Sequence, residues 1–281
     1  DCDGAVDEDC GDVTEGGCTK VSGKTSLWLL LVPLIWTRSR GVAVLSVLLM
    51  PTISQAQEPI ALIWGSAAEE YLQGPMASGD FDGDGQIDLA IANHRGFTID
   101  YAAGEVFLIR GAEVSGEIDL QGWTDVLYGE TEHDYFGRAL SVFPGEISDG
   151  LLVGQTYAGL TAAEQGEVLR FDGPLLDGVP RRADTASAVI TGDAKEDWFG
   201  EQVLRAGDLD GDGFEDFAAS APTRDRGEAE TAGTVWIFHD DLSLEEGSVV
   251  VPQVATARID GPPGTQTGWR LLAPGDIDGD G

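Results

Sequence analysis

The sequence predicts an all-β chain in which one unit, about four short strands and an acidic loop, occurs three times and then begins again. Three observations support this prediction. Acidic loops of one pattern recur, short β-rich runs opened by glycine keep a constant order around them, and no amphipathic pattern of about 12 or more residues appears between positions 57 and 281. The 39 glycines also favour turns over long helices.

The clearest acidic loop is GDLDGDGFEDFAASAP at 207–222, where carboxylates alternate with other residues before an apolar run. Two unit charges 4 Å apart repel by ~1 kcal/mol even in water, so this spacing favours a cation site over a solvated turn. In a D-x-D-x-D-G-x-x-D loop, four carboxylates and the carbonyl at position 7 converge on calcium, and a glycine at position 6 permits the turn. The predicted ligands are the side chains of Asp208, Asp210, Asp212 and Asp216 and the carbonyl of Phe214, with Glu215 facing solvent.

Two other stretches carry the same loop. GDFDGDGQIDLAIAN begins at position 79, and GDIDGDG occupies the last seven positions. Because position 12 of the loop is Ile91 or Ala219 instead of glutamate, and apolar strand-like runs follow, these loops are not EF-hands. The predicted calcium ligands are Asp80, Asp82, Asp84, Asp88 and the carbonyl of Gln86 in one loop, and Asp276, Asp278 and Asp280 in the other.

The spacing of the loops predicts a further copy without a metal. Asp80 and Asp208 are 128 positions apart, and half that interval points to a unit near position 145. Residues 134–159 align there with 197–222, including the Phe-Gly pair of each unit, but the loop is shortened to GEISDG. Asp149 is its only aspartate, so we expect this loop to bind no metal.

These features resemble the FG-GAP repeat of the integrin alpha-subunit N-terminal β-propeller and of related bacterial secreted proteins. The resemblance covers about 57–281 and rests on Phe199-Gly200, the loop 208–216, Ala221-Pro222 and the strand GTVWIF. It implies a ring of about seven four-stranded blades with calcium loops between strands, of which this chain would be a fragment holding about three and a half. Individual units depart from the pattern, with YLQG, Asn93-His94 and Gln155-Thr156 at motif positions.

The first 56 residues differ from the repeats. Residues 1–26 are acidic, and part of this segment has the spacing of a thrombospondin-type-3-like calcium loop bracketed by two cysteines that could form a disulfide in an oxidising compartment. The metal-binding candidates there are Asp1, Asp3 and Asp7, and the cysteines are Cys2 and Cys10.

Residues 27–56 hold two apolar stretches separated by TRSR. Neither reaches the ~20 apolar residues of a spanning helix, and the second has the form of a signal peptide cleaved after Ala56. Residues 1–40 as a whole resemble the end of a myxobacterial-type secreted protein with its C-terminal sorting tail. Two interpretations stay open: two adjacent reading frames joined in one chain, or a genuine extension in which Cys18 carries a lipid.

Composition narrows the function. With 50 acidic and 16 basic residues, the net charge of −34 argues against partners such as nucleic acid and anionic membranes. The sequence contains no G-x-S-x-G, H-E-x-x-H or phosphate-binding glycine loop. Because unrelated residues replace two of the histidines at equivalent repeat positions, we expect surface roles for His94, His133 and His239, although His94 departs from the repeat at a loop position. For the repeat aromatics we expect packing inside the blades, with a sugar-stacking platform as the alternative. They are Trp198, Phe199, Phe136, Phe214, Trp236 and Phe238.

By resemblance, we expect a secreted, periplasmic or cell-surface propeller without a membrane span or an enzymatic activity of its own. Its calcium would be mainly structural, and its partner would be an extracellular protein or a glycan. Two alternatives are an accessory propeller of a larger extracellular hydrolase or lyase whose catalytic part lies outside this chain, and a purely architectural part of a repetitive surface protein.

Overall fold

The computed structural model describes residues 60–65, 72, 74–96, 99–158, 165–225, 230–239 and 247–273. The chain divides into two compact units, Asp1–Gln55 and Ala56–Gly281, and every described residue belongs to the second. The expected metal-binding-like segment 1–26, the apolar segments 27–56 and the ligands predicted in the last loop all lie outside the described residues.

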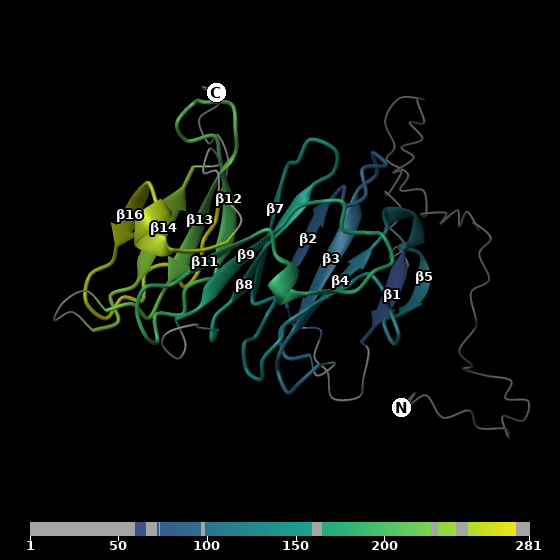
Figure 1. Cartoon of the computed structure of the whole chain (residues 1–281), viewed down its shortest axis with the longest axis horizontal. Coiled ribbons are helices and arrows are strands. Elements are labelled where there is room, and N and C mark those ends of the chain that lie inside the picture. Colours follow the sequence, from purple (N-terminus) through teal and green to yellow (C-terminus); the bar gives the residue numbers. More distant parts are fainter. Residues whose placement is uncertain are drawn as a thin grey trace, which may run out of the picture. The chain divides into compact units, whose positions relative to one another are not determined.

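Three antiparallel units of four strands follow one another along the chain, which confirms the all-β prediction and the four-stranded repeat (Figure 1). A fifth, parallel strand extends the sheets of the first two units. The first contains β2 (Met76–Gly79), β3 (Asp88–Asn93), β4 (Glu105–Ile109) and β6 (Val126–Tyr128). The second contains β7 (Ala139–Phe143), β8 (Gly150–Gln155), β9 (Glu167–Phe171) and β11 (Ala188–Thr191). The third contains β12 (Val203–Gly207), β13 (Asp216–Ala221), β14 (Thr234–Phe238) and β16 (Ala257–Asp260). Successive sheets of this kind are consistent with part of a β-propeller.

An additional strand connects each sheet to the one before it. β5 (Gly116–Asp119), β10 (Arg181–Arg182) and β15 (Gly247–Val250) each follow the third strand of one unit and pair in parallel with the last strand of the preceding unit. Their partners are β1 (Ala61–Trp64), β6 and β11. β1 therefore occupies the place of a fourth strand, and neighbouring units are joined by backbone hydrogen bonds as well as by side chains.

The helical content is small. Among the described residues, the 3-10 helices are η1 (Gly111–Glu113) and η2 (Ala183–Thr185), and α1 (Val251–Val254) is a single turn. In the part of the chain that the structure describes, no helix is long and apolar enough to cross a membrane.

The sheets bury both of their faces. In β8, Leu151 and Val153 join an apolar cluster shared with the first sheet, whereas Leu152 joins a cluster shared with the third. Because successive side chains of a strand point to opposite faces, such a strand must be apolar at every position. This explains why the runs after the acidic loops are continuous rather than alternating.

The Phe-Gly pairs pack against the preceding unit and form hydrogen bonds with its backbone. Phe136 is fully buried, and its N–H donates to the carbonyl of Ala103 at 3.0 Å. The glycine that opens the preceding β4, Gly104, has no room for a side chain, since a Cβ there would lie 2.1 Å from the Phe136 carbonyl oxygen. The glycines before the β-rich runs are therefore required by close approach of two backbones.

Two groups of side chains differ from expectation. Phe136, Phe199, Trp236 and Phe238 are buried as predicted, whereas Trp198 is only half-buried. Phe214 is 59% exposed, so the prediction that it packs inside a blade was wrong. Its loop position leaves it no neighbouring sheet to pack against.

The histidines differ in their exposure to solvent. His133 is exposed as expected, but His94 is only 9% exposed, so its predicted surface role was wrong. His94 directly follows β3, whose residues are nearly all buried, and its ring lies among residues of the adjoining unit.

Candidate metal centres

Two acidic loops connect the first and second strands of their sheets. Residues 80–87 join β2 to β3, and residues 208–215 join β12 to β13. Strands flank both loops, as the sequence predicted. The glycines at position 6, Gly85 and Gly213, have φ values of +82° and +93°, a conformation that favours glycine over any other residue.

The first aspartate of each loop organises the turn. Oδ1 of Asp80 accepts the N–H groups of Gly83 (2.7 Å) and Asp84 (3.2 Å), and Oδ2 accepts that of Gly85 (2.9 Å). Asp208 accepts the three equivalent N–H groups at 2.7, 3.1 and 2.9 Å. The same local bonds therefore form in two loops that lie 128 positions apart.

Positions 1, 3 and 9 of each loop converge. Each offers a carboxylate oxygen, and the three oxygens of a loop lie within 4.8 Å of one another. Two oxygens that each bind calcium at about 2.4 Å are at most about 4.8 Å apart, so both clusters are compact enough for a single ion. The clusters are Asp80, Asp82 and Asp88 in the first loop and Asp208, Asp210 and Asp216 in the second.

Position 5 does not join these clusters. Oδ1 of Asp84 accepts the N–H of Gln86 at 2.7 Å, and the corresponding aspartate, Asp212, accepts that of Phe214 at 2.8 Å. Both carboxylates therefore cap the backbone of the residue whose carbonyl was predicted as a ligand. The ligand roles of these four residues stay predictions.

The last aspartate of each loop is buried at the start of the second strand. Asp88 is 2% exposed and accepts N–H groups from Phe81 (2.9 Å) and Gly111 (2.8 Å). Its pKa is raised above the usual value, chiefly by burial.

Asp216 is 1% exposed, and only one of its oxygens is satisfied. Oδ2 accepts the N–H of Leu209 at 2.6 Å, whereas Oδ1 has no hydrogen-bond partner. A buried carboxylate oxygen without a partner is costly, and a cation in the cluster would remove that cost. The residues present therefore fit a hard divalent cation.

A basic side chain approaches position 3 of each loop, which sequence reasoning did not predict. Nε of Arg110 lies 3.0 Å from Oδ2 of Asp82, and Nδ1 of His239 lies 2.9 Å from Oδ2 of Asp210. Arg110 and His239 each directly follow the third strand of their unit. An alignment of the sequences of β4 and β14 places Arg110 and His239 at the same repeat position, so the sequence could have identified both residues.

The shortened loop of the second unit contacts the first acidic loop. Oδ2 of Asp149 accepts the N–H of Asp80 at 2.9 Å, and the N–H of Asp149 donates to the Asp80 carbonyl at 2.7 Å. These bonds join residues 69 positions apart. The aspartate retained in the shortened loop therefore positions the first residue of its neighbour's loop.

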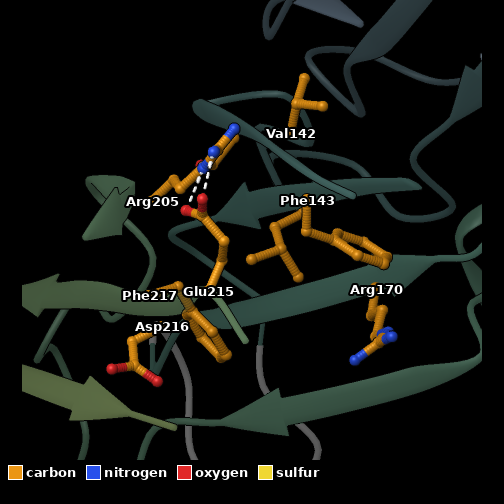
Figure 2. Close-up of a pocket in the computed structure, with 9 residues that line it drawn as sticks. Val142, Phe143, Arg170, Arg205, Glu215, Asp216 and Phe217 are labelled. Carbon is orange, nitrogen blue, oxygen red and sulfur yellow. Dashed lines mark hydrogen bonds and ion pairs between the residues drawn. The ribbon is translucent and has the colours of Figure 1, made fainter. Parts of the chain in front are cut away.

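Glu215 does not extend into solvent as predicted. Figure 2 shows its carboxylate and the guanidinium of Arg205 pointing toward each other beside Phe143 and Phe217. The small cavity that they help to line has a volume of about 10 Å³. That is about the volume needed for one water molecule, so this cavity is no ligand site.

Acidic groups with strongly raised pKa values occur at one repeated position. Burial raises the pKa of Asp134 to about 6, and burial likewise raises the pKa of Asp197 to about 6 even though Arg224 lowers it. Each of the two aspartates stands two residues before a Phe-Gly pair. Recurrence in adjacent units indicates a role in packing the repeat, not an acid–base pair for catalysis.

Comparison with known proteins supports the resemblance. The FG-GAP repeat family matches residues 199–238. The chain is 28% identical to integrin alpha-PS2 of Drosophila melanogaster over 75% of its length, and 32% identical to integrin alpha-IIb of Mus musculus and of Homo sapiens over 55% of its length. It spans 14–15% of the length of these relatives. The chain therefore contains an FG-GAP, integrin alpha-like domain.

Proposed function

We propose that this chain is part of a secreted or cell-surface β-propeller that binds calcium and acts as a protein- or glycan-binding adhesion module. The observation that carries the proposal is the repeated carboxylate cluster, with the unpartnered buried oxygen of Asp216 in one copy. Similarity to integrin alpha subunits supports the adhesion role. The net charge of −34 makes nucleic acid and anionic membranes unsuitable partners.

Calcium in these loops would be structural. When bound, it supplies the positive charge that allows three neighbouring carboxylates to stay ionised. Asp80 and Asp208 hold the turns, and Asp88 and Asp216 attach them to β3 and β13. The loop at 276–280 is proposed to bind in the same way. Extracellular calcium modules often bind at ~10⁻⁴–10⁻³ M, which suits a location where calcium is plentiful.

The calcium proposal is tested by titrating the full chain with calcium after EDTA treatment and following the melting temperature and the heat of binding. Because calcium binds the native state, saturation at 100 times Kd should stabilise the fold by about 2.7 kcal/mol per site. An unchanged melting temperature between about 0.1 and 10 mM calcium, with no heat of binding, would contradict a structural metal.

The adhesion proposal needs a separate experiment. The immobilised chain is exposed to extracellular matrix proteins and to a glycan array, in calcium and in EDTA. Binding that requires calcium supports an adhesion module whose loops are shaped by the metal. If the calcium-saturated, folded chain binds nothing on either panel, the adhesion role is wrong.

A further inference from the structure

The inner strands of three successive units begin around one basic pocket. Its volume is about 280 Å³, and its lining comes from the starts of β2, β7 and β12 and from three basic side chains, His94, Arg138 and Arg270. The remaining lining residues are Gly74, Pro75, Ala139, Leu140, Gln202 and Val203. In a chain with 50 acidic residues, a pocket whose lining includes no carboxylate marks a place for a negatively charged group.

Arg138 is held in a fixed orientation. Its Nε and Nη2 donate to the two carboxylate oxygens of Glu201 at 2.8 and 2.5 Å, and Glu201 is almost completely buried. This pair joins the second unit to the third, and Arg138 lines the pocket. Such a preoriented planar group suits a carboxylate.

Arg270 supplies the net charge of the pocket. It is exposed, and within the described ranges no carboxylate pairs with it. Since Glu201 neutralises Arg138, Arg270 leaves about one positive charge at this site.

His94 completes the pocket wall. Its ring is nine-tenths buried, and its Nδ1 has no hydrogen-bond partner. Burial, helped by Arg138 and Arg95, lowers the pKa of His94 to about 4, so the ring is neutral at physiological pH. A buried imidazole without a partner costs free energy, and such groups are found where a site serves binding.

A continuous row of aromatic side chains, which we call the aromatic row, crosses the units beside this pocket. Neighbouring ring centroids in the row lie 4.9–6.1 Å apart. The row consists of Tyr101, His133, Tyr135, Tyr157, Trp198 and Trp269. His94 meets it at Tyr135, with 6.1 Å between the ring centroids, so pocket and row are adjacent.

The aromatic row is accessible from solvent. Tyr101 is 56% exposed and Trp269 39% exposed, at opposite ends. Of the four rings between them, His133 is exposed and the other three are half-buried. Ring faces combined with a few polar groups bind ligands that have apolar faces and hydroxyl edges, a description that fits pyranose rings. The rings come from different units, so their use as one surface requires the folded repeat.

We propose that the aromatic row and the basic pocket together bind an acidic oligosaccharide, with sugar rings stacked along the row and a sugar carboxylate in the pocket. The inference rests on the proposed function, since it names the ligand class of the adhesion module. The positive charge of the pocket disfavours a basic peptide. The length of the aromatic row favours a ligand with several sugar rings over a small ligand that offers only a carboxylate.

The test uses the full chain saturated with calcium and titration calorimetry or tryptophan fluorescence. The acidic probes are a hyaluronan hexasaccharide and sialyllactose, and the neutral counterparts are N-acetylchitohexaose and lactose. We expect at least one acidic probe to bind roughly tenfold or more tightly than its neutral counterpart, the value of one charged hydrogen bond. Equal affinities for both kinds of sugar, or no binding at all, would overturn the proposal.

Variants locate the site. Arg270→Gln is expected to remove the preference for the acidic sugar, and Trp269→Ala to weaken both kinds of sugar. The matched control is Arg258→Gln, since Arg258 lies on β16 and pairs with Asp260. If Arg258→Gln has the same effect as Arg270→Gln, or if an acidic peptide competes fully with the sugar while sugars alone bind weakly, the proposal is wrong.

A melting curve of each protein with and without calcium tests the structural-calcium proposal separately from the acidic-oligosaccharide proposal. Calcium stabilisation without sugar binding would refute only the acidic-oligosaccharide proposal. Absence of calcium stabilisation would refute the proposed structural metal independently of the sugar result.

Discussion

The two acidic loops have the same cluster of carboxylates but different surroundings. In the first, Phe81 at position 2 is fully buried, and its carbonyl accepts the N–H of Leu175 from the next unit at 2.8 Å. In the second, the residue at position 2, Leu209, is 55% exposed. Among the described residues, the next unit therefore contacts the first loop, whereas most of the chain that follows the third unit lies outside the described ranges.

Other contacts increase this difference. Arg110 reaches Asp82, approaches Asp125 at 3.6 Å and donates to the carbonyl of Leu176. Within the described ranges, the second loop has the His239 contact at the equivalent position, and an oxygen of Asp216 is unpartnered. Two copies of one motif therefore differ in the protein contacts that the described residues make to them.

The largest effect should come from removing ligands in either loop. Asp208→Ala with Asp212→Ala should abolish the stabilisation by calcium at the second loop, about 2.7 kcal/mol at 100 times Kd. The matched double variant Asp80→Ala with Asp84→Ala should lose less calcium-dependent protection from amide hydrogen exchange than Asp208→Ala with Asp212→Ala does, because protein contacts still hold the first loop. Melting curves and amide hydrogen exchange with and without calcium measure both. Identical exchange of the two loops in EDTA would refute the difference.

A smaller effect is expected from Asp149→Ala. The sequence predicted that the loop of Asp149 binds no metal itself, but the Asp149 carboxylate accepts the backbone N–H of Asp80 in the first acidic loop. We now expect a cost of about 1–3 kcal/mol and weaker calcium binding at the first loop only. Glu146→Ala, an exposed change in the same short loop, is the control. Calorimetry that shows unchanged affinity at both loops would disprove the coupling.

Removing the basic neighbours should change calcium affinity in the opposite direction. Arg110→Gln takes a positive charge away from Asp82, so calcium should bind the first loop several-fold more tightly. The metal-free protein should at the same time lose about 1 kcal/mol, because the contacts of Arg110 with the next unit are lost. His239→Gln should do less, since an imidazole carries a full charge only when protonated. Weaker calcium binding in Arg110→Gln would contradict competition between guanidinium and metal.

The smallest effect concerns pH. The folded-state pKa of Asp88 is raised above its unfolded value, so the folded protein binds this proton more tightly in the window between the two values. In EDTA, the contribution of Asp88 to stability should therefore increase as pH falls through that window, and it should decrease again as pH rises. Calcium competes with the proton, so the calcium-dependent gain in melting temperature should shrink in the same window. Asp88→Asn should flatten the metal-free pH dependence, and a slope unchanged by that substitution would exclude Asp88 as its origin.

The sequence by itself determined the turns and strands that depend on a short segment of the chain. Residues 208–216 contain the turn glycine and the carboxylates, and β13 begins at Asp216. The structure has the turn, the strand and three converging carboxylates where the spacing placed them, but Asp212 does not join the cluster. The repeat interval likewise predicted the four-stranded units, and the continuous apolar runs predicted buried strands. Such features follow from backbone conformation and side-chain period, which a short segment specifies alone.

Only the tertiary structure decided which residues of different units meet. The Asp149–Asp80 bonds, the Arg138–Glu201 pair and the aromatic row connect positions far apart in the chain. His94 and Phe214 were misjudged for the same reason, because their burial depends on what a neighbouring unit places beside them. Spacing within one unit says nothing about the rotation between units, and that rotation determines the pocket, the aromatic row and the support of each loop.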